Sequence, residues 1–150
     1  MISSVLSQYS LFNGLEQEQI ERVLPFMEHE VYEAGTDIIV EGSYVGRIRF
    51  IVDGHVAVIK AGMVLTEFGD GAVFGELEVV DVEPAEASVK ALTATKVMTL
   101  SVDALGELYE QDIKTYSFIL MNLARNISRR LRRMDFEAVR SSSGAGLEQK

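Results

Sequence analysis

The segment "RIRFIVDGHVAVIKAGMVLTEFGDG", from Arg47 to Gly71, decides the fold class of this 150-residue chain. Apolar and polar residues alternate along it with a period of about two, which is typical of half-buried β-strands. "DGH" at Asp53 to His55 predicts a hairpin turn, and "AGM" at Ala61 to Met63 predicts a second tight turn. Connections this short exclude parallel crossovers, so we expect the strands to pair antiparallel.

The same pattern extends on both sides of this segment, from about residue 29 to residue 100. Short runs of β-branched and aromatic residues, separated by turn residues, predict about eight strands. We therefore expect an eight-stranded antiparallel β-roll, jelly-roll-like, in a mainly β domain of the α+β class.

Helical periodicity appears before and after the predicted roll. In "NGLEQEQIERVLPFM" the apolar residues that share one helical face are Leu15, Ile20, Val23 and Leu24. Pro25 is expected to end or bend this helix. Ser101 is a plausible N-cap for a helix after the roll, and a longer helix is expected from Ile113 to Phe136. These elements predict a single domain over residues 1–136, with C-terminal helices at about 101–136 and a flexible tail at 137–150.

Composition excludes several classes of protein. A hydrophobic content of 47% is sufficient for a buried core, so a disordered chain is not expected. The absence of cysteine excludes disulfides and thiolate catalysis and fits a reducing compartment. No apolar run approaches the roughly 20 residues needed to span a bilayer, and the N-terminus does not resemble a signal peptide. We expect a soluble cytoplasmic protein that does not bind membranes.

Charge is distributed unevenly along the chain, whose net charge is -9. Residues 1–112 contain 20 acidic and six basic residues, whereas residues 113–150 contain three acidic and eight basic residues. An acidic body disfavours nucleic-acid binding, because DNA affinity depends largely on neutralising phosphates. Only the C-terminal part has the charge for such a surface.

No constellation of catalytic or metal-binding residues is recognisable. His29 and His55 are the only histidines, and neither has nearby residues at metal-ligand spacing. This argues against a metal site of the kind found in cupins, another β-roll family. Ser88 has no paired histidine, so it is not expected to act as a nucleophile. The sequence predicts no catalytic residue, no metal site and no enzymatic activity.

Several motifs, taken in order, resemble the cyclic nucleotide-binding domain family, of the catabolite activator and protein kinase A regulatory subunit type. The resemblance covers about residues 11–134. "YEAGTDIIVEG" resembles an early turn and strand of the family, and "RFIVDGHVAV" is similar to its central hairpin, with Gly54 in the turn. "GDGAVFGEL" resembles the start of the family's phosphate-binding cassette, and "PAEASVKALT" resembles its end.

The resemblance implies a ligand pocket for a cyclic nucleotide, cAMP or cGMP. Gly75 would permit close approach of the backbone, Glu76 would accept a hydrogen bond from the ribose hydroxyl, and residues 77–80 would form a short helix. The ligand-binding residues implied in this way are Phe74, Gly75, Glu76, Leu77, Ala85, Glu86, Ala87 and Ser88.

The cassette departs from the family at its phosphate-binding arginine. Ungapped alignment through Pro84 and Ala87 places Ala85 at the arginine position, and Glu86 adds a carboxylate beside it. Loss of a charge-assisted pair costs about 2 to 5 kcal/mol, so we expect nucleotide affinity to fall by about two orders of magnitude or more. Whether another base replaces the arginine is left open by the sequence; the candidates are Lys90, Arg47 and Arg49.

The long C-terminal helix has an apolar stripe with spacings of three and four. Its members are Tyr116, Leu120, Leu123, Ile127, Leu131 and Met134. Four arginines lie away from this stripe, namely Arg125, Arg129, Arg132 and Arg133. The resemblance implies that this helix packs on the roll or pairs with its copy in a homodimer, and that it relays ligand occupancy. Because the family's transcription factors continue into a helix-turn-helix domain and this chain ends first, no direct DNA binding is expected.

Two functional hypotheses follow from the resemblance and its departure. In the first, a degenerate cassette has weak or lost nucleotide binding, and the domain acts as a protein-interaction and dimerisation module for an unidentified partner. In the second, the domain is a cAMP or cGMP sensor that uses non-standard phosphate contacts and relays occupancy through the C-terminal helix. The missing arginine and Glu86 favour the first.

Overall fold

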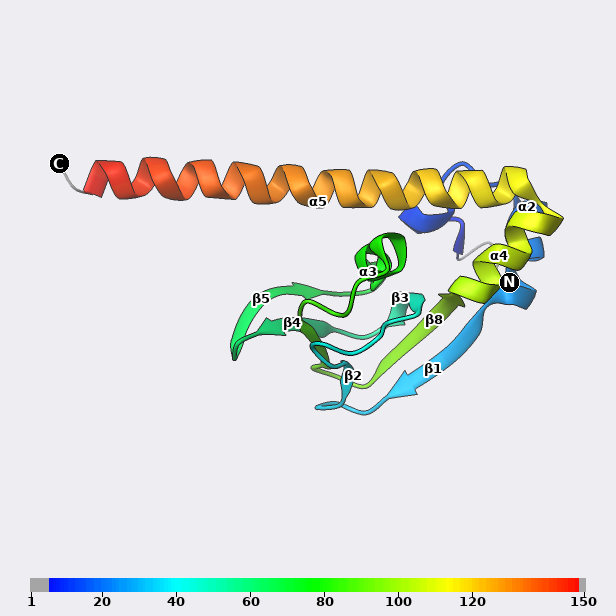
Figure 1. The fold of residues 1–150 in the computed structure, drawn as a ribbon, viewed down its shortest axis with the longest axis horizontal. Helices are drawn as coiled ribbons and strands as arrows, with labels where there is room; N and C mark the ends of the chain where they lie inside the picture. The colour runs from blue at the N-terminus through cyan, green and yellow to red at the C-terminus, as the bar shows by residue number, and fades with distance from the viewer. Residues whose placement is uncertain (1–5, 149–150) are drawn as a thin grey trace.

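The computed structural model describes residues 6–148 and begins with short helices that close one end of a β-roll (Figure 1). A 3-10 turn, η1 (Ser10–Phe12), precedes helix α2 (Gln17–Val23), which begins with a reciprocal capping box between Glu16 and Gln19. Pro25 lies in a second 3-10 turn, η2 (Leu24–Phe26), and so ends α2 as predicted. Residues 1–5 of the expected domain lie outside the described part of the chain.

Within residues 6–148, eight strands form two four-stranded sheets, which confirms the predicted antiparallel roll. The first sheet has the order β1-β8-β3-β6, and the second has the order β2-β7-β4-β5. The strands are β1 (Glu28–Tyr32), β2 (Asp37–Ile39), β3 (Arg47–Asp53), β4 (Val56–Lys60), β5 (Met63–Phe68), β6 (Val73–Phe74), β7 (Ser88–Ala91) and β8 (Thr95–Ser101). All described pairings are antiparallel.

One predicted hairpin is wrong. The "DGH" segment joins β3 to β4, but β3 pairs with β6 and β8 while β4 pairs with β5 and β7, so the segment turns a corner between the two sheets. Gly54 is required at this corner because its φ is 143° and a Cβ atom would lie 2.7 Å from the Cα of Thr95. The "AGM" turn does form the β4–β5 hairpin, with positive φ at Ala61 and Gly62.

Two clusters of buried side chains stabilise the fold. One, the helix-side cluster, lies between the first sheet and the helices, and it includes Phe12, Phe50 and Leu108. The other lies between the two sheets, and its members include Phe74 and Val89. The second cluster fixes the ends of β6 and β7, the two strands on either side of the segment that resembles the cassette.

Two helices follow the roll. Helix α4 (Val102–Gln111) is N-capped as predicted, because the side-chain oxygen of Ser101 accepts a hydrogen bond from the backbone N–H of Ala104 at 3.0 Å. Helix α5 (Ile113–Glu148) passes over α3 (Glu76–Asp81) and extends beyond the end of the roll (Figure 1).

The N-terminal half of α5 is attached firmly to the domain. Ile119 and Leu123 are buried in the helix-side cluster, where burial stabilises by about 1.5 to 3 kcal/mol for each such side chain. The buried side-chain amide of Asn122 donates hydrogen bonds to the carbonyl oxygens of Leu11 at 2.8 Å and Asn13 at 2.9 Å. Beyond this half, every side chain from Leu131 to Arg140 is exposed.

The predicted end of the long helix at Phe136 is wrong, because α5 continues to Glu148. Residues 137–148 contain no proline, and the two glycines at positions 144 and 146 cost only about 1 kcal/mol each relative to alanine, so nothing in the segment forces the helix to stop. The flexibility expected of residues 137–150 stays a prediction, and residues 149–150 lie outside the described range.

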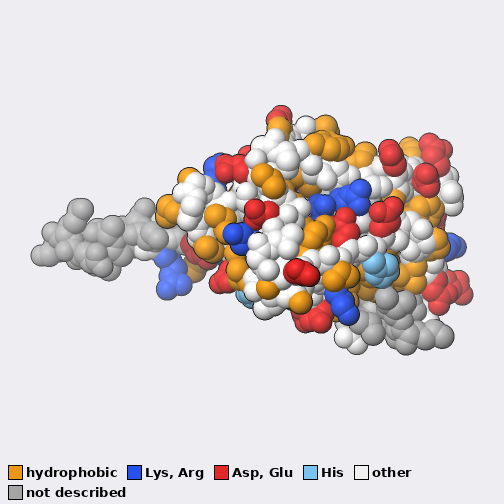
Figure 2. All heavy atoms as spheres, turned by 90° about the horizontal axis from the view of Figure 1, so that it is seen from below, with side chains coloured by type: hydrophobic (Ala, Val, Ile, Leu, Met, Phe, Trp, Pro, Cys, Tyr) orange, Lys and Arg blue, Asp and Glu red, His pale blue; other side chains and the backbone are white. Residues whose placement is uncertain are grey.

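Charged side chains of both signs lie on the face of the roll that is opposite α5. Figure 2 shows acidic side chains spread over this face among basic, apolar and uncharged ones. No helix within the described residues combines the length and apolar character needed to cross a bilayer. Nor does that part of the chain gather three side chains of the His, Cys, Asp and Glu types into a cluster for a metal ion.

Candidate functional site

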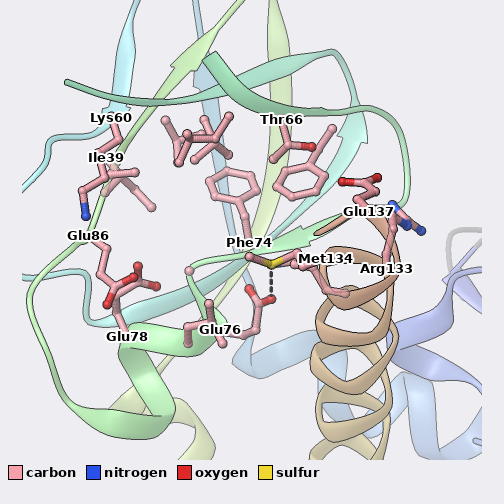
Figure 3. A pocket seen from close by; sticks show the side chains of 18 of the residues that line it. Ile39, Lys60, Thr66, Phe74, Glu76, Glu78, Glu86, Arg133, Met134 and Glu137 are labelled. Atoms are coloured by element: carbon pink, nitrogen blue, oxygen red, sulfur yellow. Dashed lines mark ion pairs between the residues drawn. The ribbon is translucent and has the colours of Figure 1, made fainter. Parts of the chain in front are cut away.

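A cavity of about 690 Å³ lies between the roll, α3 and α5. Its wall is largely apolar. The apolar residues that line it include Ile39, Val58, Phe68, Phe74, Leu77 and Val89. Charged side chains enter from several elements, namely Lys60, Glu76, Glu78, Glu86, Arg130, Arg133 and Glu137. In Figure 3, Glu78 and Glu86 lie near α3 on one side, whereas Arg133 and Glu137 lie on α5 at the other.

A glycine turn aims the start of α3 into this cavity. Gly75 follows β6 with a φ of 83°, and a Cβ atom there would lie 3.0 Å from the carbonyl oxygen of Arg47 and 3.2 Å from Cγ1 of Val45. Both the backbone conformation and the close approach therefore require glycine. The turn places Glu76 as the first residue of α3.

Glu76 is a fully buried carboxylate, with a relative exposure of 0%. Its Oε1 lies 2.7 Å from Nη1 of Arg130, and this ion pair is the dashed line in Figure 3. Its Oε2 is buried without a hydrogen-bond partner among the described residues. Burial raises the pKa of Glu76 above its usual value, and the positive charge of Arg130 offsets only part of this increase.

Arg130 enters the site from α5 and makes three contacts with its guanidinium group. Besides the ion pair with Glu76, Nη2 donates a hydrogen bond of 2.8 Å to the carbonyl oxygen of Val73. The guanidinium carbon also lies 4.7 Å from the centroid of the Phe68 ring, within the range of a cation–π interaction. These contacts hold α5 across the cavity.

The second predicted group of site residues, at the N-terminal end of β7, is only partly at the cavity. Glu86 and Ala87 line it, whereas Ala85 is 4% exposed and packs in the cluster between the sheets. The backbone of Ala85 is held by hydrogen bonds with Gly42 and Ser43, at 2.8 and 2.9 Å.

Ser88 does not line the cavity either. Its Oγ accepts a hydrogen bond of 2.9 Å from the backbone N–H of Glu41. At the other predicted wall, Phe74, Gly75, Glu76 and Leu77 all line the cavity. The structure thus brings together six of the eight residues predicted at the ligand site and leaves Ala85 and Ser88 behind the wall.

None of the three bases considered as replacements for the missing arginine lines the cavity. Arg47 pairs with Glu28 and Glu30, at 3.3 and 3.2 Å. Arg49 pairs with Glu30 at 2.9 Å, and the two guanidinium groups together with Tyr32 hold the pKa of Glu30 below its usual value despite the opposing effect of burial.

Sequence reasoning missed Arg130. The spacing places Arg130 beside the predicted stripe, three residues after Ile127 and four before Met134, but it does not show that this edge of the stripe faces the roll. Of the six residues in the predicted stripe, Leu123 is buried in the helix-side cluster and Tyr116 packs against it. The exposed members are Leu120, Leu131 and Met134, and Met134 also lines the cavity. The side of α5 that faces the roll is thus rotated from the stripe.

A β-roll with a glycine turn, a short helix carrying a buried carboxylate and a long helix over the cavity together form a candidate ligand pocket. Residues 29–112 match the model of the cyclic nucleotide-binding domain family. The chain therefore belongs to the cyclic nucleotide-binding domain family, as the sequence motifs indicated.

Comparison with individual proteins agrees with this assignment. The chain is 27% identical, over 85% of its length, to the cyclic AMP receptor protein of Thermus thermophilus, and it spans 59% of that protein. A cyclic nucleotide-binding domain from Methylobacillus flagellatus superposes with a TM-score of 0.84 at 25% identity, over 93% of this chain and 82% of that one. The regulatory domain of Toxoplasma gondii protein kinase A, solved with cAMP, gives a TM-score of 0.62 at 28% identity, over 70% and 42%.

Proposed function

We propose that this member of the family is a non-catalytic regulatory domain that acts as a protein-interaction and dimerisation module and whose binding of cyclic nucleotides is weak or lost. The observation that supports this most directly is the ion pair between Arg130 and Glu76 at 2.7 Å. One oxygen of the carboxylate expected to receive a ribose hydroxyl is already paired with the chain's own guanidinium group. A nucleotide would have to displace that pair before it could bind there.

The rest of the wall adds to the cost of binding a phosphate. Ala85, at the position of the family's arginine, contributes no charge, and Glu86 adds a carboxylate to the cavity. An anion placed beside Glu86 and Glu78 would experience repulsion in place of the missing charge-assisted pair.

Isothermal titration of the purified protein with cAMP and with cGMP tests this proposal. We expect no saturable heat at micromolar nucleotide, because the loss of about 2 to 5 kcal/mol shifts a dissociation constant by about two orders of magnitude or more. Saturable binding in the micromolar range would contradict the proposal. The Arg130→Ala variant, titrated in parallel, separates the effect of the ion pair from that of the cassette.

A cAMP or cGMP sensor is the second candidate, and one observation favours it. Three basic side chains, Lys60, Arg130 and Arg133, do line the cavity, so phosphate contacts from α5 and β4 would replace the one lost from the cassette. In this case occupancy would be relayed through α5, which already contacts the cavity. The same titration decides between the two functions.

Homodimerisation through α5 is part of the proposal, and so is a further, unidentified protein partner. The apolar side chains available to a second copy are the exposed ones, including Leu120, Leu131 and Met134, whereas Leu123 is used within the protomer. We expect light scattering coupled to size exclusion to give a dimer mass at micromolar concentrations, and Leu131→Glu to shift it toward the monomer. A monomer mass for the unaltered protein at high concentration would refute dimerisation. A cytoplasmic location and the absence of direct DNA binding stay predictions.

A further inference from the structure

The three contacts of Arg130 together make a binding site for a guanidinium group. A carboxylate, a carbonyl oxygen and an aromatic face are supplied by Glu76, Val73 and Phe68, at 2.7, 2.8 and 4.7 Å respectively. A planar group with five N–H donors and a delocalised charge is the cation that uses all three kinds of partner at once. The contacts of Arg130 therefore indicate that the cavity is suited to a guanidinium group.

The buried end of this site retains unused capacity. Oε2 of Glu76 lies in a fully buried side chain and has no hydrogen-bond partner among the described residues. A carboxylate accepts a guanidinium group most favourably through both oxygens, in two parallel hydrogen bonds. A guanidinium free of the constraint of α5 would therefore have the second oxygen available.

The charges of the side chains that line the cavity also favour a cationic ligand. Without Arg130, the described lining contains four carboxylates, Glu76, Glu78, Glu86 and Glu137, against two basic groups, Lys60 and Arg133. A cavity of this composition attracts cations and repels anions. Glu86 in the wall weakens a site for an anion and favours one for a cation.

The guanidinium group of Arg130 belongs to a part of α5 that can be displaced from the cavity. Arg130 is 27% exposed, and all ten side chains that follow it on α5, from Leu131 to Arg140, are exposed. Among the described residues, no hydrogen bond or ion pair joins positions 131–140 to the roll, so Arg130 provides the polar attachment of this part of the helix, while the N-terminal half of α5 is anchored separately.

We propose that the cavity is a binding site for guanidinium groups on an aliphatic stem, in which Arg130 is the intramolecular occupant and a free guanidinium compound or an arginine of another chain is the exchanging ligand. The proposal rests on the proposed function in one respect, namely that the pocket has lost its preference for phosphate. A ligand of this class would replace Arg130 at Glu76 and release the C-terminal part of α5.

Rescue of a vacated site tests the proposal. Arg130→Ala removes the occupant, and n-propylguanidinium chloride, which reproduces the end of an arginine side chain, is the probe. We expect this variant to bind the probe saturably at millimolar concentrations by isothermal titration and to gain several degrees in Tm. The unaltered protein and Arg129→Ala, which removes an exposed neighbouring arginine, should gain less than one fifth of that shift. Equal concentrations of sodium chloride control for ionic strength.

A second pair of measurements makes the result specific to the site. Glu76→Gln combined with Arg130→Ala should weaken probe binding at least tenfold. The peptide acetyl-Gly-Arg-Gly-amide, titrated against Arg130→Ala, distinguishes the sources: binding of the probe alone assigns a small free ligand, and binding of both assigns an arginine within a chain. Absence of probe binding to Arg130→Ala, or equal binding by the double variant, would overturn the proposal. Should Arg130→Ala not fold, Arg130→Gln provides the same test.

Failure of this inference is distinguishable from failure of the proposed function. Micromolar binding of cAMP by the unaltered protein contradicts the proposed function even where Arg130→Ala binds the guanidinium probe. Conversely, absence of both cAMP binding and probe binding overturns the guanidinium site and leaves the proposed function intact.

Discussion

Replacing Ala85 with arginine and Glu86 with serine together is expected to increase the affinity for cAMP by about a hundredfold or more. The double change supplies a charge-assisted partner for the phosphate and removes a carboxylate from the cavity wall. Such a pair contributes about 2 to 5 kcal/mol, and each 1.4 kcal/mol is a tenfold change in affinity. Isothermal titration of the double variant and the unaltered protein measures the difference.

The backbone at position 85 is fixed, but the side chain there is buried. Ala85 is anchored by hydrogen bonds to Gly42 and Ser43, is 4% exposed and packs between the sheets. An arginine at this position has to leave the core to reach the cavity lined by Glu86 and Ala87, so thermal denaturation of the double variant accompanies the titration and checks that it folds. The second barrier, the pair between Arg130 and Glu76, is unchanged by the substitution.

Matched variants separate charge from shape. Ala85→Gln with Glu86→Ser has a side chain of comparable reach without the positive charge, and we expect it to recover only a small part of the gain. Glu86→Ser alone should give a modest increase, since it removes repulsion without adding a partner. Equal affinities of the arginine and glutamine variants would show that the cassette cannot present a cation to the phosphate.

The roll could be predicted from the sequence because apolar and polar residues alternate clearly along its short strands. The helix boundaries at Pro25 and Ser101 could be predicted because these residues act on their immediate neighbours in the chain. The error at "DGH" has a physical origin. Gly54 satisfies the same backbone requirement in a hairpin and at a corner between sheets, and only the long-range pairing of β3 with β8 and β4 with β7 distinguishes the two. Pairing partners so far apart in sequence are not encoded in the turn.

The site was predictable in part for the same reason. Gly75 and Glu76 are adjacent, so the motif that contains them defines one wall. Arg130 lies on α5, 54 positions after Glu76. Its role depends on the rotation of α5 about its axis, which is set by the packing of Ile119 and Leu123 in the helix-side cluster. The apolar stripe indicated a face for a partner but did not identify the side that covers the roll.

Arg130→Met is expected to lower the free energy of unfolding by about 2 to 3 kcal/mol at pH 8. Methionine retains most of the aliphatic stem and removes the charge, so a buried Glu76 carboxylate is left without a counter-ion. Breaking a fully buried pair costs about 3 to 5 kcal/mol, and the smaller figure here reflects the 27% exposure of Arg130. Urea denaturation of the variant, with Arg129→Met as the control at an exposed position, measures the loss.

The pH dependence of this loss identifies its cause. Burial raises the pKa of Glu76 in the folded protein, and Arg130 opposes that increase, so the variant should have a still higher pKa. A raised carboxyl pKa contributes stability when the group is protonated, and that contribution disappears as the pH rises from the unfolded value through the folded value. The difference between variant and unaltered protein should therefore be small near pH 5 and grow toward pH 8, while other titrating groups cancel. Glu76→Gln in the Arg130→Met background should make the difference independent of pH, and a constant loss from pH 5 to pH 8 without it would assign the effect to packing of the arginine stem.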